Sequence, residues 1–531
     1  MKFFLPALAL SFVSLACATT NQSIADNSKQ KATHATLPST STNNIQPLPQ
    51  NIIMVIGDGM GPAYTTAYRY FSDNPETTIV EQTVFDRHLT GLSTTYPASI
   101  SGVVTDSAAS ATALATGVKS YNGAIGVDVN KNEVQTVLEW AKLQGKKTGV
   151  IVTSQINHAT PASYLTHNEY RKNYNEIADS YIDNGIKADL YLGGGWNYFI
   201  REDRNLVNEF KQAGFHYIDN YSGLSNLPNN KPVLGLFADK GLPWALDDTN
   251  KHRLSTMTKA GIHHLLDLQQ SDTEEDNGFF MLIEGSQVDW AGHGNDISSA
   301  MAEMDDLAKT IEYLEHFVEH HPNTLVIVTA DHGDAIASHG AGWDKYSTYT
   351  EEVGRVPLVM RWPANIKAGQ RSERLVSGLD VTASLVAAAK ADLSDLDGRD
   401  LLADAPIETE DEVLVVEHYG HSGDVAFQRI VYHGDWKYVV AWGDDDEFYN
   451  LADDPYELSN RLQDDTVINT LRKLQQFALD DLRQERAARE IEFPQSEMEF
   501  KLVISNDHWP REERLLQYKL ERALGENSCS V

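Results

Sequence analysis

Short, continuous runs of apolar residues recur along the chain, and each has the length of a buried strand. A strand that is buried on both faces lacks polar alternation, as in a parallel sheet that is covered by helices. Most runs are separated by stretches long enough for a helix, so the pattern predicts an α/β fold with one central, mostly parallel sheet flanked by helices. The runs are Asn51–Ile56, Thr148–Thr153, Ala188–Leu192, Phe279–Ile283, Thr324–Thr329 and Val356–Met360.

The pattern changes after about residue 390, where short segments alternate with polar turns. Such segments are typical of antiparallel strands, and an amphipathic helical pattern follows over residues 471–490. We therefore predict a main catalytic domain over residues 49–390, a small antiparallel subdomain over 391–470 and a helical C-terminal tail over 471–531. The expected strands are Val413–Glu417, Ala426–Tyr432, Trp436–Trp442 and Glu447–Tyr449.

The N-terminus has the pattern of an export signal. A basic start is followed by the apolar run Phe3–Leu15, which ends in Ala-Cys-Ala and is too short to cross a bilayer as a stable helix. We expect a signal peptide over residues 1–18 with cleavage near Ala18, and lipid attachment at Cys17 as the alternative. Residues 19–48 are rich in Ser, Thr, Asn and Gln and are expected to form a disordered linker. The protein is therefore expected to be periplasmic or extracellular.

The composition restricts the partners. The formal net charge is -33, from 43 basic and 76 acidic residues, which argues against nucleic acid and anionic membranes. A small anionic substrate stays compatible with this charge, because a local metal cluster overrides the global field. No later segment is long and apolar enough for a membrane helix. The only cysteines are Cys17 and Cys529, so cleavage near Ala18 leaves no pair for an intrachain disulfide.

Polar residues follow the predicted strands, at the sheet edge where ligands bind in α/β proteins. Two of them, Asp289 and His293, are four residues apart and share one face of a helical turn, and a carboxylate with an imidazole suits zinc. Ser107 begins an Ala- and Ser-rich helix, where backbone amides favour a phosphate. The candidate site residues in these segments are Asp58, His158, Thr160, Glu284, Asp289, His293, Asp331 and His332.

These motifs together resemble the alkaline phosphatase family over about residues 51–334. The segment Thr105–Ala113 closely matches the nucleophile motif of that family, and Glu284–His293, His158–Pro161 and Leu192–Gly195 match as well. The resemblance implies two Zn²⁺ and one Mg²⁺. It implies Asp58, Asp331 and His332 for one zinc, Asp289 and His293 for the other, and Asp58, Thr160 and Glu284 for magnesium.

The same resemblance implies an enzyme, an alkaline phosphatase that hydrolyses small phosphate monoesters through a phosphoserine on Ser107. Arg171 falls where the family keeps its phosphate-binding arginine, and His158 and Trp290 occupy variable places beside the metals. A cation near Ser107 lowers the pKa of its hydroxyl and makes it a nucleophile. For the oligomeric state, we consider a homodimer as well as a monomer.

Beyond Asp331 the sequence instead resembles the related sulfatases. The third protein ligand of the zinc at Asp289 and His293 is therefore open between His339 and His421, and Lys345 matches a sulfate-binding lysine. The matching strings are Asp331-His332-Gly333, Ser338-His339-Gly340, Trp343-Asp344-Lys345, Gly354-Arg355-Val356-Pro357, Gly434–Lys437 and Phe448–Pro455.

Three other functions compete with phosphate monoester hydrolysis. A sulfatase needs a modified cysteine or serine followed by a characteristic Pro and Arg pattern, whereas Ser107 is followed by Ala-Ala-Ser. A phosphodiesterase or phosphonate-ester hydrolase would differ in the shape of its pocket rather than in its metals. A non-enzymatic, exported metal-binding protein would lack the nucleophile or a metal ligand, and every position assigned above is present.

Overall fold

The computed structural model describes residues 48–89, 91–95, 97–98, 105–271, 276–334, 350–372, 374–389, 396, 398–403, 412–418, 427–442 and 446–492. Several predictions lie outside the described residues. They concern the signal peptide and its cleavage or lipid attachment, the linker, the end of the tail, His339, Lys345 and His421. Within the described ranges, no helix is long and apolar enough to cross a membrane.

The larger of two sheets has ten strands, in the order β10-β2-β9-β8-β1-β7-β3-β4-β6-β5. Every pair is parallel except β8–β9 and β2–β9. The strands are β1 Asn51–Gly57, β2 Gly91–Thr94, β3 Lys147–Gln155, β4 Leu190–Gly194, β5 His216–Ile218, β6 Val233–Leu236, β7 Phe279–Gly285, β8 Thr324–Ala330, β9 Arg355–Arg361 and β10 Val376–Ser377.

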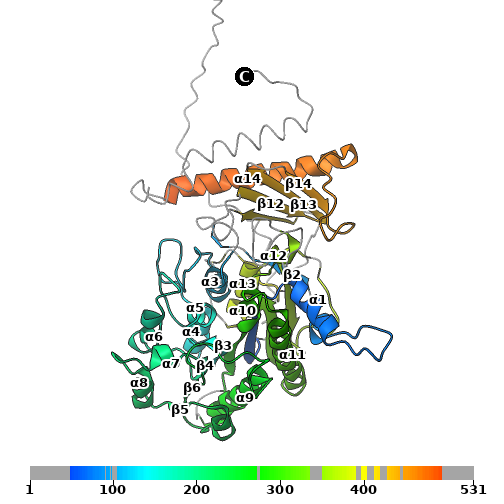
Figure 1. Cartoon of the computed structure of the whole chain (residues 1–531). Coiled ribbons are helices and arrows are strands. Elements are labelled where there is room, and N and C mark those ends of the chain that lie inside the picture. Colours follow the sequence, from blue (N-terminus) through cyan, green and yellow to red (C-terminus); the bar gives the residue numbers. More distant parts are fainter. Residues whose placement is uncertain are drawn as a thin grey trace, which may run out of the picture. The chain divides into compact units, whose positions relative to one another are not determined.

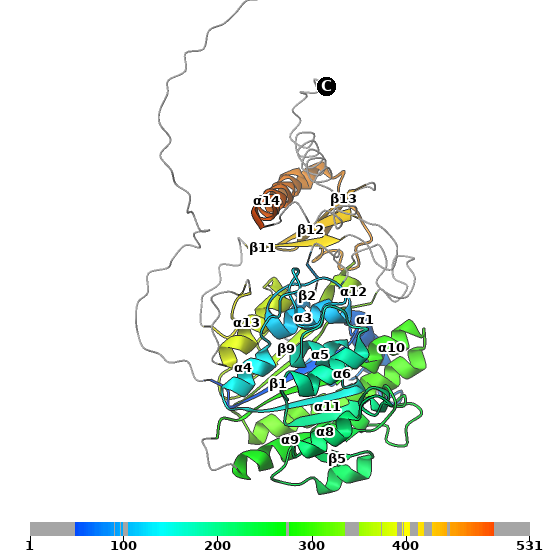
Figure 2. The same cartoon turned by 90° about the vertical axis from the view of Figure 1, so that its left-hand side faces the viewer.

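Helices cover both faces of this sheet (Figures 1 and 2). Alternate residues of β1 face opposite layers: Ile52 and Met54 pack with α3, α4 and α5, whereas Ile53 and Val55 pack with α9 and α11. The helices are α1 Pro62–Phe71, α2 Val84–His88, α3 Ser107–Thr116, α4 Val137–Leu143, α5 Ala159–Leu165, α6 Tyr174–Asp183, α7 Trp196–Phe199, α8 Leu206–Gln212, α9 Arg253–Ser271, α10 Gln287–His293, α11 Ile297–His320, α12 Glu351–Gly354 and α13 Gly378–Ala388. The predicted α/β fold with a mostly parallel central sheet is confirmed.

The direction of β9 differs from the expectation that Val356–Met360 is one of the parallel strands. Arg355–Arg361 runs antiparallel to β8, with Val328 opposite Val359. The reason lies in the connection. Gly333, just after β8, donates a backbone hydrogen bond to Val353 of α12, so β9 begins near the carboxyl end of β8 and runs back along it. A chain that returns from the same edge gives an antiparallel pair.

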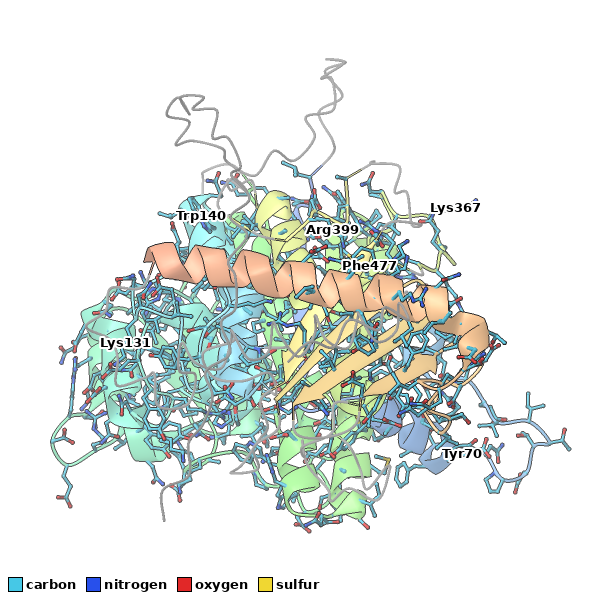
Figure 3. All side chains as sticks on the ribbon, turned by 90° about the horizontal axis from the view of Figure 1, so that it is seen from above. Tyr70, Lys131, Trp140, Lys367, Arg399 and Phe477 are labelled. Atoms are coloured by element: carbon cyan, nitrogen blue, oxygen red, sulfur yellow. The ribbon has the colours of Figure 1, made fainter. Side chains whose placement is uncertain are left out.

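A second, four-stranded sheet is antiparallel throughout, in the order β11-β12-β13-β14. Its apolar side chains, Val431 and Phe448 among them, pack against Leu471, Leu474 and Leu479 of a long helix. Figure 3 shows this helix, α14, lying across the strands. The small antiparallel part of the predicted fold is therefore confirmed. The elements are β11 Val413–His418, β12 Phe427–His433, β13 Trp436–Trp442, β14 Glu447–Asn450 and α14 Ile468–Glu492.

Candidate active site

Three neighbouring strands bring the predicted acidic residues to one edge of the central sheet. β1 lies between β7 and β8. Asp58 follows β1 directly, Glu284 is the second-last residue of β7 and Asp331 follows β8, and all three side chains are fully buried. Residues far apart in the sequence thus meet at the carboxyl ends of parallel strands, as the sequence predicts.

A glycine turn after β1 makes room for this convergence. Gly59 has a φ of +72°, which favours glycine, and its backbone nitrogen donates to Asp331 Oδ1 at 3.0 Å. A Cβ on Gly59 would lie 3.0 Å from both Cβ and Oδ1 of Asp289. The turn therefore holds Asp58, Asp331 and Asp289 close together.

His332 faces a group of carboxylates. Its Nε2 lies 3.4 Å from Asp58 Oδ1, 3.6 Å from Asp331 Oδ2 and 3.8 Å from Asp289 Oδ1. Its Nδ1 lies 3.0 Å from the carbonyl oxygen of Gly333, which only accepts, so Nδ1 carries a proton. Nε2 therefore faces the three carboxylates, and Asp58, Asp289 and His332 have the spacing of metal ligands.

Asp289 and His293 lie on one side of α10, as their spacing predicts. His293 Nε2 is 3.3 Å from Asp289 Oδ2, and the His293 side chain is 49% exposed. The pair therefore offers a nitrogen and an oxygen at the open side of the cluster. The two candidates for a third ligand, His339 and His421, lie outside the described residues, so the choice between them stays a prediction.

A second group of ligands gathers around Glu284. Asp58, His158 and Glu284 have ligand atoms within 4.8 Å of one another. Among the described residues, the buried Asp58 Oδ2, Glu284 Oε1 and Thr160 Oγ1 have no partner in good hydrogen-bonding geometry, although Thr160 lies close enough to Glu284 to lower its pKa. Buried polar atoms without partners are costly, and oxygen-rich sites suit magnesium. The residues present therefore fit a magnesium ion.

The carboxyl groups of this cluster oppose one another's ionisation. Burial raises the pKa of Glu284 to about 8, although Ser286 and Thr160 oppose this rise in part. Burial, together with the charges of Asp331 and Asp289, raises the pKa of Asp58 well above its ordinary value. Such crowding of acids in a dry site is the electrostatic complement of bound cations.

Ser107 is the first residue of α3 and is almost fully buried. Asp106 caps the helix, and its Oδ1 accepts from the backbone nitrogen of Ala109 at 2.9 Å. Ser107 Oγ donates to Asp58 Oδ1 at 3.2 Å. The structure thus places the predicted nucleophile beside the acidic cluster, at a helix N-terminus that favours an anion.

Arg171 is held by Asp106, the residue before Ser107, and by His158. Its Nη1 donates to Asp106 Oδ2 at 3.0 Å, and its Nη2 donates to His158 Nε2 at 3.3 Å. Burial opposes the ionisation of Asp106, but the Arg171 charge and backbone hydrogen bonds outweigh it, so the pKa of Asp106 is lowered. Burial and the Arg171 charge lower the pKa of His158 to about 3, which keeps its ring neutral. The rings of His158 and Trp290 pack in a T-shaped arrangement, with their centroids 5.3 Å apart.

Two residues of the site were given no role by the sequence analysis. Asp106 orients Arg171, and a capping Asp just before the predicted helix was the available signal. Ser286 Oγ donates to Glu284 Oε2 at 2.7 Å and lies 3.0 Å from Ser154 Oγ, and all three side chains are fully buried. A serine two residues after an acid carries no comparable signal, because the contact depends on the local path of the chain.

Comparisons with known proteins agree with both resemblances. The family model "Alkaline phosphatase" matches residues 49–356, and "N-sulphoglucosamine sulphohydrolase, C-terminal" matches residues 338–485. Alkaline phosphatase 3 of Bacillus subtilis (strain 168) is 44% identical over 343 residues, which is 63% of this chain and 70% of that protein. The predicted junction of a phosphatase-like and a sulfatase-like part is therefore confirmed.

Solved structures point to the same fold. The cold-active alkaline phosphatase from the psychrophile Shewanella sp. is 50% identical, with a TM-score of 0.50 over 57% of this chain and 74% of that one. The alkaline phosphatase from the Antarctic bacterium TAB5 is 28% identical, with a TM-score of 0.53 over 65% of this chain and 99% of that one. A variant of the TAB5 enzyme has Mg bound in its M3 site.

Proposed function

Because the chain belongs to the alkaline phosphatase family, we propose that it hydrolyses small phosphate monoesters and releases inorganic phosphate. Ser107 is the nucleophile, and a phosphoserine on this residue is the covalent intermediate. The observation that carries the proposal is the position of Ser107 Oγ, 3.2 Å from Asp58 Oδ1 and next to the cluster of buried acids.

The cluster is assigned two Zn²⁺ and one Mg²⁺. The assigned ligands are Asp58, Asp331 and His332 for the first zinc, Asp289, His293 and either His339 or His421 for the second, and Asp58, Thr160 and Glu284 for magnesium. When bound, the ions lower the pKa of a hydroxyl or a water molecule and stabilise negative charge on a departing oxygen.

The reaction proceeds by two displacements at phosphorus. Ser107 Oγ loses its proton, for which Asp58 Oδ1 is the acceptor nearest in the structure, and forms a bond to phosphorus while the ester oxygen leaves. Water then attacks the phosphoserine, the Ser107 oxygen–phosphorus bond breaks, and inorganic phosphate is released. Both displacements need a phosphoryl group that is fixed in position.

Arg171 supplies that fixation. Asp106 and His158 hold two nitrogens of its guanidinium, so its planar fork is preorganised for two phosphate oxygens. We expect Arg171→Ala to raise both KM for a monoester and the inhibition constant of inorganic phosphate about 10- to 100-fold, since charge-assisted hydrogen bonds contribute about 1.5–3 kcal/mol. Arg171→Lys, which keeps the charge but loses the fork, should fall between. Unchanged phosphate inhibition in Arg171→Ala would contradict this role.

The proposed function is tested with purified protein and three aryl substrates: a phosphate monoester, a phosphate diester and a sulfate ester. The monoester should turn over fastest, and chelation should abolish its turnover until Zn²⁺ and Mg²⁺ are restored. Ser107→Ala should lose turnover and the acid-trapped phosphoenzyme while melting at the same temperature. Full turnover in Ser107→Ala, or turnover that ignores the chelator, would refute the proposal. A diester that is hydrolysed faster than the monoester would favour the phosphodiesterase alternative.

We further propose that the protein acts outside the cytoplasm, on the basis of residues 1–18, and on small esters rather than nucleic acids. The formal net charge of -33 supports the second point, because it repels polyanions. Cell fractionation tests the first point, and a nucleic-acid gel shift tests the second. Light scattering of the purified protein distinguishes the monomer from the homodimer.

A further inference from the structure

The short helix α12 lies directly against two loops of the proposed metal centre. Gly333 donates a backbone hydrogen bond of 3.2 Å to the carbonyl oxygen of Val353. A Cβ on Gly333 would lie 2.1 Å from the carbonyl oxygen of Glu352, and a Cβ on Gly61 would lie 2.7 Å from the same atom. Because no side chain fits at either glycine, the position of α12 limits where both loops can run.

Glu351, the first residue of α12, is held by residues of the C-terminal sheet. Its Oε1 accepts from the hydroxyl of Tyr432 at 2.8 Å and lies 3.3 Å from Lys437 Nζ. Its backbone nitrogen donates to Glu457 Oε2 at 2.9 Å, and Glu457 Oε1 accepts from Lys437 at 2.5 Å. Both the backbone and the side chain of Glu351 are therefore fixed by β12, β13 and the segment after β14.

Among the described residues, two cations and two carboxylates belong to this group. Arg355, at the start of β9, donates to Glu351 Oε2 at 2.6 Å and supplies the second cation. The Lys437 side chain is 0% exposed and that of Glu457 is 4% exposed. Charges in such a dry site depend on their partners, since the loss of one leaves another buried and uncompensated. We call Glu351, Arg355, Tyr432, Lys437 and Glu457 the α12 anchor.

Two of the charged residues that α12 meets come from strings that resemble sulfatases, and the third follows such a string. Arg355 belongs to Gly354-Arg355-Val356-Pro357, Lys437 ends the string Gly434–Lys437, and Glu457 follows Asp454-Pro455 by two residues. The proposed phosphate chemistry uses none of them. All three residues contact Glu351 in the structure. Arg355 and Lys437 contact its side chain, and Glu457 accepts a hydrogen bond from its backbone nitrogen.

We infer that the sulfatase-like part of the chain positions the metal centre, with Lys437, Glu457 and Tyr432 as positioning residues that act through α12. The inference rests on the proposed assignment of Asp58, Asp331 and His332 as metal ligands. The α12 anchor fixes α12, α12 confines Gly61 and Gly333, and these glycines lie within three residues of those ligands.

The test compares two anchor variants with a matched control. Lys437→Met removes the buried cation, and Tyr432→Phe removes one hydroxyl and keeps the ring. Arg429→Met is the control: Arg429 lies in the same sheet and is buried like Lys437, and it pairs with Asp481 of α14. The probe is Co²⁺, added to the metal-free full-length protein. Its visible absorption reports the geometry of the ligands without any need for turnover.

We expect Lys437→Met to bind Co²⁺ about tenfold more weakly than the parent, the lower end of the effect of groups that orient metal ligands. Its absorption bands should shift, and kcat should fall more than KM changes. Tyr432→Phe should show the same changes to a smaller degree. Arg429→Met should lower the melting temperature and keep the Co²⁺ spectrum and affinity of the parent.

The outcomes separate this inference from the proposed function. If the parent binds no metal or hydrolyses no monoester, the proposed function fails. If the parent does both, and folded Lys437→Met and Tyr432→Phe keep its Co²⁺ affinity and spectrum, the inference is overturned. Should Lys437→Met fail to fold, Tyr432→Phe decides alone, and a parent-like Co²⁺ titration of that variant overturns the inference.

Discussion

Removal of the metals is expected to make the stability of the protein fall as the pH rises from 4.5 to 8. Glu284 is fully buried, and burial is the main reason that its pKa rises from 4.5 to about 8. A carboxyl with a higher pKa in the folded chain than in the unfolded chain binds its proton more tightly when folded. Its contribution to stability is therefore fully present below pH 4.5 and is lost as the pH rises through 8.

The size of this loss follows from the two pKa values of Glu284. At about 1.4 kcal/mol per pH unit, the difference amounts to about 5 kcal/mol of unfolding free energy. Asp58 acts in the same direction, because burial and neighbouring acids raise its pKa as well. His158 acts in the opposite direction: burial lowers its pKa from 6.5 to about 3, so it stabilises the fold above pH 6.5 and less as the pH falls toward 3.

Glu284→Gln removes one titrating carboxyl from the cluster, because glutamine does not titrate, and it also removes a charge that raises the pKa of Asp58. Urea unfolding of chelated parent and variant, followed by circular dichroism from pH 4.5 to 8, should show the parent losing several kcal/mol more than the variant. With Mg²⁺ in excess the extra loss should disappear, because the ionised carboxylate is then a ligand. Parallel curves for the metal-free parent and variant over this range would refute the reasoning.

Two further substitutions test the packing around the site. Gly59→Ala places a methyl group 3.0 Å from Asp289 at a φ of +72°. The variant should therefore retain zinc less well, and its unfolding free energy should fall by more than backbone strain alone would cost, which is about 1–2 kcal/mol. Gly185→Ala is the control, because its φ is +82° and nothing lies within 4 Å of the added methyl group. Its thermal melts should show the loss from backbone strain alone. Equal zinc retention in the two variants would contradict the proposed effect of the methyl group at Gly59. Arg253→Met leaves the charge of buried Glu303 unpaired and should cost about 3–5 kcal/mol in urea unfolding. A loss below about 1 kcal/mol would mean that the pair is not a buried ion pair in solution.

The central strands could be predicted from the sequence because each contains an almost continuous run of apolar residues. β1, β7 and β8 are buried at every position, which is the pattern of a strand covered on both faces. β2 and β10 left no such signal. Gly91–Thr94 and Val376–Ser377 are short and take their strand conformation from pairing with β9 and with each other. The direction of β9 depends on where α12 ends, which no local pattern encodes.

The candidate site could be located because its acids follow strands that meet at one edge. Asp58, Glu284 and Asp331 are in this position, and their proximity follows from strand order. The α12 anchor could not be predicted in this way. Lys437 is an ordinary charged residue in the sequence, and its burial against Glu351 appears only when two separate sheets are in place. Long-range ion pairs of this kind have no periodicity to detect.

The place of β1 in the sheet also affects how the chain folds during synthesis. β1 is the first described strand to be made, yet its partners are β7 and β8, with Ile52 opposite Phe280 and Leu325. Until residues 279–330 have been made, the largely apolar β1 has no partner strand, and such exposed segments promote aggregation. Pairing over this sequence distance also closes a long loop and is slow. Refolding is therefore expected to be slow and to depend on protein concentration, and the metal centre should form only in its last stage.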